Sequence, residues 1–266
     1  MLQPDTTAIA EARAPRLQAP IVLVHGLLGY HEIRVGNWEV VSYFPGIAAA
    51  LRAAGNRVLM PWMSPTCGIA DRARQLSQYI ERELPGEPIH LIAHSMGGLD
   101  CRYAISRLGL GARVLTLTTV ATPHRGSPFA DWGVRRLARL ARPLFEFLDI
   151  PYQAFYDLTT ENCRRFNDET PDVPGVRYFS VGGQFDGSWR SPEWQLPYQI
   201  VRLSEGPNDG LVSLHSASYG EGNDIGEGDH LSLINWKGPV AQARGTWVDR
   251  TPQYLELVRR LASLGF

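Results

Sequence analysis

Apolar runs alternate with amphipathic stretches along most of the chain. Continuous apolar segments, typical of strands buried on both faces, occupy residues 20–26, 56–62, 88–94, 114–121 and 177–183, with 199–203 as a further candidate. Helix-like stretches follow or separate them at residues 43–54, 69–84, 96–108 and 252–264. This alternation predicts an α/β fold with a mostly parallel central sheet and helices on both faces.

Residues 127–174 break the alternation. They contain no good strand but two helix-like stretches, 131–150 and 154–169, so we expect a helical lid insertion within a single domain of residues 1–266. The first stretch combines an apolar stripe (Trp132, Leu140, Leu144, Phe145 and Leu148) with four arginines (Arg135, Arg136, Arg139 and Arg142). Such a helix suits a lipid interface. Alternatively, the stripe packs on the sheet and the arginines are solvated.

Ser95 follows the apolar run 88–94 and precedes the helix predicted over 96–108. A serine presented on a sharp strand-to-helix turn needs small residues two positions before and after it, and these are Ala93 and Gly97. The helix that follows directs its amide dipoles toward developing negative charge. This context favours a nucleophile, and the alternative is a helix N-cap.

A nucleophilic serine requires a histidine to take its proton and a carboxylate to orient that histidine. Asp209, in an Asn-Asp-Gly turn, and His230, in a later glycine-rich loop, follow Ser95 in this order. The rival acids are Asp186, Asp224 and Asp229, and the rival base is His124, after a strand end. We expect His25 and His94 to shape turns, and His31, His90 and His215 to serve packing or the surface.

Two backbone N–H groups must stabilise the oxyanion that forms when serine attacks an ester. Met96 follows the nucleophile, and Leu27 lies in the glycine loop HGLLG after the first strand, so these two residues are the candidates. The alternative for HGLLG is a simple glycine turn. Apolar residues proposed to accommodate an acyl chain are Leu27, Leu28, Phe129, Trp132 and Leu211.

Composition narrows the function classes. The 266 residues carry 26 basic and 27 acidic side chains, a net charge of -1, which lacks the basic excess of nucleic-acid-binding proteins. No apolar stretch reaches the roughly 20 residues of a membrane helix. The first twenty residues do not resemble a secretory signal, which predicts a cytoplasmic location or secretion without such a leader. Cys67, Cys101 and Cys163 show neither disulfide-scaffold nor zinc spacing.

Together, VLVHGLLG, AHSMGGLDCRY, VATPHRGSPFAD, PNDGLVS and DHLSLIN resemble the bacterial true lipases of the α/β-hydrolase superfamily, of the Pseudomonas, Burkholderia and Proteus type. The resemblance spans about residues 19 to 236 and implies an α/β-hydrolase fold with Ser95, Asp209 and His230 as the catalytic triad. It also implies Leu27 and Met96 as oxyanion donors, no required cofactor, and a helical lid that opens at lipid surfaces.

The resemblance has departures. Many family members bind a structural calcium through two aspartates, one of them two residues after the catalytic histidine, where this chain has Ser232. Because calcium prefers carboxylates and several oxygen ligands, we expect no such site, although Asp186 matches the other aspartate. No cysteine lies near the PNDGLVS turn, where secreted relatives have a disulfide.

The resulting expectation is a lipase that cleaves medium- to long-chain acylglycerols by a Ser-His-Asp acyl-enzyme mechanism. An esterase for short-chain esters or a phospholipase is the alternative within catalysis. A non-catalytic binding module on the same fold is the alternative from another class, because a fold does not guarantee an activity. The substrate is an ester or lipid, reached in solution or at a lipid-water interface, and the sequence leaves the oligomeric state open.

Overall fold

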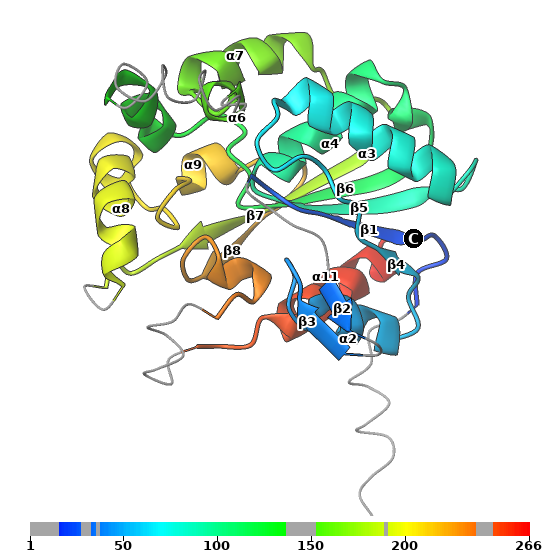
Figure 1. Ribbon diagram of the computed structural model, residues 1–266. Coiled ribbons are helices and arrows are strands. Elements are labelled where there is room, and N and C mark those ends of the chain that lie inside the picture. The colour runs from blue at the N-terminus through cyan, green and yellow to red at the C-terminus, as the bar shows by residue number, and fades with distance from the viewer. Residues whose placement is uncertain (1–15, 28–32, 36–37, 137–152, 189–190, 238–246) are drawn as a thin grey trace, which may run out of the picture.

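A six-stranded sheet forms the centre of the protein in the computed structural model, which describes residues 16–27, 33–35, 38–136, 153–188, 191–237 and 247–266 (Figure 1). The strand order is β4-β1-β5-β6-β7-β8, and every neighbouring pair is parallel. The bounds are β1 Ile21–Val24, β4 Val58–Leu59, β5 Ile89–His94, β6 Val114–Val120, β7 Arg177–Gln184 and β8 Asn223–Glu227. The mostly parallel sheet predicted from the sequence is confirmed.

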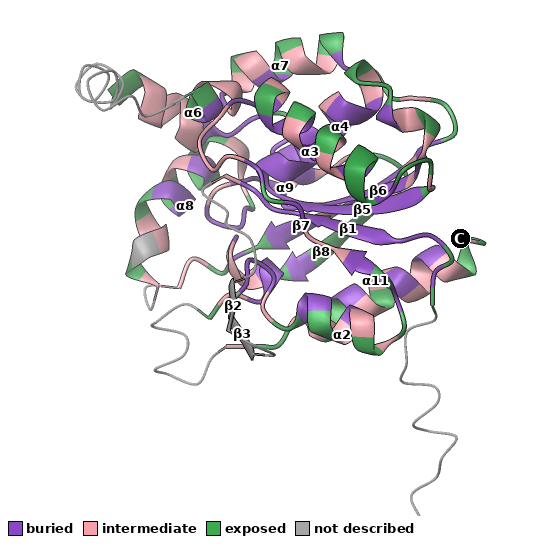
Figure 2. Ribbon diagram, turned by 45° about the vertical axis from the view of Figure 1, so that its right-hand side comes forward, coloured by how far each residue is buried: buried purple, intermediate pink, exposed green. Residues whose placement is uncertain are grey.

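Helices cover both faces of this sheet, as Figure 2 shows. The helices α3 (Ile69–Glu83) and α4 (Met96–Arg107) lie on one face, and α2 (Ile47–Ala53) and α11 (Thr251–Ser263) lie on the other. The remaining elements are β2 (Ile33–Val35) and β3 (Trp38–Val41), which form an antiparallel pair, α6 (Gln153–Asp157), α7 (Thr160–Glu169), α8 (Pro192–Glu205), α9 (Leu214–Ala217), and the 3-10 turns η1 (Leu110–Ala112) and η2 (Ser232–Ile234).

Side-chain alternation along β1 divides the core in two. Ile21 and Leu23 join the cluster that contains α2 and α11. Val22 and Val24 point the other way, into the cluster that contains α3 and α4. Successive strand residues face opposite sides of a sheet, so a strand covered on both faces must be apolar at every position. That requirement explains the uninterrupted run in the sequence.

The predicted strand over 199–203 is wrong, because these residues lie within α8. Pro192 opens this helix, where its missing N–H costs nothing. Tyr198 and Val201, three positions apart, are buried on one side, whereas Leu203 is 86% exposed. A short apolar run does not distinguish a strand from a helix that buries only one face.

The strand β8 was not predicted. Four of its five residues are exposed, and only Gly226 is buried. This strand lies at the edge of the sheet and pairs with β7. A polar edge strand avoids association with other chains, and its composition is therefore close to that of a loop.

The predicted insertion over 127–174 lies partly outside the described residues. The structure has a helix over 128–136, whereas Leu140, Leu144, Phe145, Leu148, Arg139 and Arg142 fall in the range 137–152, which it does not describe. The second stretch, 154–169, is divided into α6 and α7 because the Thr159 side chain caps α7 by accepting a hydrogen bond from the Asn162 N–H. The lid, and the single domain that contains it, stay predictions.

All three cysteines are free thiols. Within the described ranges, none of the helices has both the length and the apolar composition needed to cross a membrane.

Candidate active site

Ser95 lies between the end of β5 and the start of α4. It adopts φ 55° and ψ −133°, a conformation that non-glycine residues rarely adopt and that marks functional turns. Its backbone N–H donates to Val120 O at 2.9 Å, and its carbonyl accepts from the Thr122 hydroxyl at 2.7 Å. These contacts with the end of β6 hold the turn in place.

Gly97 explains why the turn needs small residues. A Cβ at this position would lie 2.7 Å from His25 O and 2.9 Å from Val24 O, closer than any real Cβ contact. The first turn of α4 therefore packs directly against the end of β1. This close approach brings the loop after β1 to Ser95.

Three side chains from separate loops meet at the carboxyl edge of the parallel sheet. His230 Nε2 lies 2.9 Å from Ser95 Oγ, and His230 Nδ1 lies 2.7 Å from Asp209 Oδ2. Because an ionised carboxylate only accepts, Nδ1 carries the proton and Nε2 is free to accept one from Ser95. The relative exposures of Ser95, His230 and Asp209 are 8%, 4% and 0%, so their hydrogen bonds are shielded from bulk water.

Asp209 is held by its own turn. Its Oδ1 accepts backbone N–H bonds from Leu211 at 2.9 Å and Val212 at 2.7 Å, while its backbone carbonyl accepts the His230 N–H at 2.8 Å. These bonds stabilise the charged carboxylate in a buried position. Oδ2 is thereby directed at the imidazole.

His94 supports His230 from behind. His94 Nε2 donates to the His230 carbonyl at 3.0 Å, and His94 Nδ1 accepts from the Tyr43 hydroxyl at 2.8 Å. Burial, together with the neighbouring His230, holds the pKa of His94 well below its ordinary value, so this imidazole stays neutral. The sequence predicts that His94 shapes the turn, but it does not predict the contacts of His94 with Tyr43 and with the His230 carbonyl, because both residues are distant from it in sequence.

The other candidate bases lie elsewhere. His124 bonds Thr119 Oγ1 at 3.0 Å and stacks on Tyr219. His90 bonds Thr116 Oγ1, and His215 is exposed. His31 lies outside the described residues.

The rival acids have other partners. Asp224 forms an ion pair with Arg260 at 2.7 Å. Asp229 accepts backbone N–H bonds from Leu231 and Ser232. Asp186 is exposed and accepts the Ser188 N–H. Asp209 is therefore the acid that the fold brings to His230.

Leu27 and Met96, the predicted oxyanion donors, lie near each other in one apolar cluster. The preceding residue, Gly26, is so close to Ser95 that a Cβ on it would lie 2.7 Å from Ser95 Cβ. The loop after β1 and the first residue of α4 thus border the same space above Ser95.

The structure describes most of the apolar residues that are expected to hold an acyl chain. Phe129 and Trp132 stack with ring centroids 5.8 Å apart. The Ser127 hydroxyl donates to Leu211 O at 2.6 Å, which places the start of the 128–136 helix beside the turn that carries Asp209. Leu28 lies outside the described residues.

The donor set does not fit the calcium site that the resemblance implies. Ser232 replaces the aspartate after the histidine, and its hydroxyl donates to Asp229 O at 2.8 Å. Among the described residues, no group of three or more His, Cys, Asp or Glu side chains is arranged to hold a metal. A neutral hydroxyl committed as a donor is a poor ligand for calcium.

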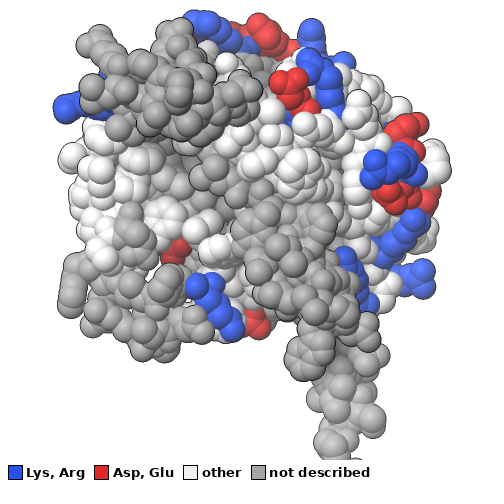
Figure 3. All heavy atoms as spheres, viewed as in Figure 1, with Lys and Arg blue, Asp and Glu red and all other residues white. Residues whose placement is uncertain are grey.

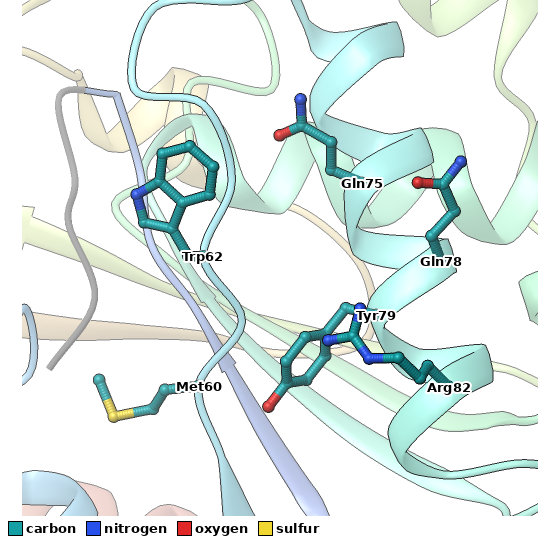
Figure 4. Close-up of a pocket in the computed structure, with 6 residues that line it drawn as sticks. All are labelled: Met60, Trp62, Gln75, Gln78, Tyr79 and Arg82. Atoms are coloured by element: carbon teal, nitrogen blue, oxygen red, sulfur yellow. The ribbon is translucent and has the colours of Figure 1, made fainter.

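A groove of about 480 Å³ lies between the segment that follows β4 and the helix α3 (Figure 4). Its lining residues are Met60, Trp62, Gln75, Gln78, Tyr79 and Arg82. Figure 3 shows that basic and acidic side chains lie next to one another over the α3 side of this view, whereas the surface over α8 is mostly uncharged. Leu196 and Leu203 of α8 are exposed.

Comparisons with known proteins identify the family. Residues 21–258 match the model of the alpha/beta hydrolase family. Triacylglycerol lipase 2 of Saccharomyces cerevisiae is 34% identical over 86% of this chain and 76% of its own length, and a triacylglycerol lipase of Pseudomonas fragi is 27% identical over 92% and 97%. The mature Bacillus licheniformis lipase BlEst2 superimposes with a TM-score of 0.65 at 26% identity, over 85% of this chain and 91% of that one. The chain belongs to the alpha/beta hydrolase family.

Proposed function

We propose that this protein is a carboxylic ester hydrolase, specifically a lipase that cleaves medium- to long-chain acylglycerols. The observation that carries the proposal is the continuous hydrogen-bonded chain from Ser95 Oγ through His230 to Asp209, with contacts of 2.9 and 2.7 Å. These hydrogen bonds convert a weakly nucleophilic hydroxyl into a group that can attack an ester. The lipase relatives support the ester substrate.

The reaction has two halves. Ser95 Oγ attacks the ester carbonyl carbon while His230 Nε2 takes the hydroxyl proton, and Asp209 stabilises the imidazolium. The Leu27 and Met96 N–H groups bind the oxyanion. His230 then protonates the departing alkoxide, which leaves as the alcohol, and the acyl group stays on Ser95. Next, His230 deprotonates a water molecule, which attacks the acyl carbon. The bond from that carbon to Ser95 Oγ then breaks, His230 returns the proton to Ser95 Oγ, and the carboxylic acid is released.

Acyl-chain specificity is assigned to the apolar side of the site. Phe129 and Trp132 form a flat stacked pair, and Leu211 is tied to the start of their helix through Ser127. We assign Leu27, Leu28, Phe129, Trp132 and Leu211 to the acyl-chain site, and the finer resemblance to the Pseudomonas, Burkholderia and Proteus lipases supports a long chain. The mostly uncharged surface over α8 is compatible with an apolar substrate or a lipid interface.

The test is hydrolysis of esters from C2 to C18, above and below their solubility limits, beside a Ser95→Ala variant. We expect highest activity on medium or long chains and a fall in kcat of about 10⁶-fold in the variant. A fluorophosphonate probe should label wild-type Ser95. Preference for C2 to C4 would support a short-chain esterase, cleavage of phospholipids alone a phospholipase, and absence of both labelling and hydrolysis a binding module.

The same assay tests the metal. We propose catalysis without calcium, so EDTA is expected to leave both the rate and the unfolding temperature unchanged. Loss of either on EDTA treatment, restored by calcium, would refute this part of the proposal.

A further inference from the structure

Arg72 of α3 is a fully buried cation that none of the triad residues contacts directly. Its side chain and that of its partner Asp100 are both 0% exposed. Arg72 Nε donates to Asp100 Oδ2 at 2.8 Å, and Nη1 donates to Ser64 O at 2.7 Å. Burying a charge is costly unless it is paired and hydrogen-bonded. The Asp100 carboxylate and the Ser64 carbonyl therefore stabilise the buried guanidinium.

The remaining Arg72 donors go to the loop after β1. Nη2 donates to His25 O at 2.8 Å and to Gly26 O at 3.3 Å. The Gly26 carbonyl also accepts from His25 Nδ1 at 2.8 Å, a tautomer fixed by the Met63 N–H, which donates to His25 Nε2 at 3.1 Å. Two donors therefore hold one carbonyl on the α3 side of the loop.

The Gly26 carbonyl belongs to the same peptide unit as the Leu27 N–H. No peptide bond among the described residues is cis, and in a planar trans peptide the C=O and N–H bonds point in opposite directions. Anchoring the carbonyl toward Arg72 and His25 thus directs the Leu27 N–H away from α3. The loop borders Ser95 at this point, since a Cβ on Gly26 would lie 2.7 Å from Ser95 Cβ.

From this arrangement we infer that Arg72, oriented by Asp100, is a positioning residue that fixes the direction of the Leu27 N–H and so completes the oxyanion site. The inference rests on the proposed ester hydrolysis. The planar guanidinium suits the task because it holds three carbonyls and one carboxylate at the same time, which an ammonium group cannot do. Asp100 also belongs to α4, so the ion pair fixes the position of the loop relative to the helix that presents the nucleophile.

A pair of substrates distinguishes this role from a general effect on the fold. The pair is an ester and its thionoester, in which C=S replaces C=O, with the same acyl chain and leaving group. The sulfur anion accepts backbone N–H bonds poorly, so the thionoester rate depends little on the oxyanion site, whereas both rates depend on the triad. The ratio of the ester rate to the thionoester rate therefore measures the oxyanion site alone.

We expect Arg72→Met to lower kcat for the ester by about 100-fold, in the range measured for loss of one oxyanion donor. KM and the thionoester rate should change little, so the ratio of the two rates falls by about the same factor. The matched control is Arg102→Met. Arg102 is also a buried arginine, 4% exposed, but it donates to Thr170 O and Asn167 Oδ1, on the side of α4 away from the loop. The control should leave the ratio unchanged.

If Arg72→Met does not fold, Asp100→Asn decides the question, because asparagine keeps an oxygen acceptor for Arg72 Nε but holds it less firmly. A fall in the rate ratio supports the inference. An unchanged ratio in a folded variant, or a parallel loss on both substrates, overturns it. Failure of wild-type hydrolysis, or an active Ser95→Ala protein, would instead overturn the proposed function.

Discussion

Two buried arginine clusters, on different sides of α4, show how the same residue type serves different purposes. The Arg72 cluster (Arg72, Asp100, His25 and the carbonyls of Gly26 and Ser64) pairs its charge with a carboxylate and borders the nucleophile. The Arg102 cluster (Arg102, His124, Phe166, Asn167 and Tyr219) places its guanidinium carbon 4.1 Å from the Tyr219 ring centroid and 5.2 Å from that of Phe166.

The difference between the clusters lies in what each one connects. The Arg72 cluster joins α3 and α4 to the loop after β1, where an error in backbone direction would change the reaction. The Arg102 cluster joins α4 to α7 through Asn167 and Thr170 O. We therefore expect changes on the first side to affect catalysis and changes on the second side to affect stability.

The largest loss of activity is expected from a change at Asp209, in the candidate active site. In Asp209→Asn, the amide oxygen can still accept the Leu211 and Val212 N–H bonds, so the turn survives. The amide NH₂ would then face His230 Nδ1 and favour the tautomer with the proton on Nε2, which cannot accept one from Ser95. We expect kcat to fall about 10⁴-fold.

Steady-state kinetics together with urea unfolding would check this expectation. Arg102→Met is again the control, because it should reduce the free energy of unfolding while leaving kcat near wild type. A large loss of kcat in that variant would erase the contrast between the two clusters.

A smaller effect, on the free energy of unfolding, is expected at His124 when the pH falls. Burial, and then the charges of Arg102 and Arg125, hold the pKa of His124 well below its ordinary value of 6.5. Below about pH 6.5 the unfolded chain therefore binds a proton that the folded protein does not. The stability that this residue contributes is present above that pH and is lost as the pH falls, by up to about 1.4 kcal/mol per pH unit.

The variant His124→Gln should accordingly lose less free energy of unfolding between pH 7 and pH 5 than wild type does, by up to about 2 kcal/mol. Urea unfolding at both pH values measures this, and His215→Gln, an exposed position, controls for loss of an imidazole. Equal losses in the His124 variant and in wild type would show that His124 is protonated in the folded protein.

The smallest effect is expected at Tyr219. Its hydroxyl donates to Asp172, and its ring stacks on His124 with centroids 4.2 Å apart. Tyr219→Phe removes the hydrogen bond and keeps the ring, so unfolding should become easier by about 1 kcal/mol. Thermal unfolding gives the stability change, and an altered kcat would indicate that the Arg102 cluster reaches the active site.

Much of the fold could be predicted because burial on both faces demands a distinctive sequence. The strands β1, β5, β6 and β7 are nearly continuous apolar runs, and each was found. The edge strand β8 was not predicted, because most of its residues are exposed to solvent and resemble those of a loop. The sequence predicts a strand for part of the helix α8, because the buried face of this helix is only a few residues long.

The three side chains that meet at the candidate site were also predictable from the sequence, since Ser95, Asp209 and His230 each lie in a turn with small or glycine neighbours. Arg72 gave a weaker signal, a charged residue among the apolar positions Ile69, Ala73 and Leu76 of one helix. His94 and Tyr43 gave none, because their hydrogen bonds join residues 51 and 136 positions apart.

By itself, the sequence determined the alternation of strands and helices, the turn that presents Ser95, and the choice of Asp209 and His230 as candidate acid and base. These follow from local rules: periodicity sets which faces are buried, and small residues permit tight turns. Only the tertiary structure decided which buried groups orient the reacting ones, because hydrogen bonds are short and directional, and they depend on how distant segments pack. The fold alone brings the Arg72 guanidinium to the Gly26 carbonyl and the His94 imidazole to the His230 carbonyl.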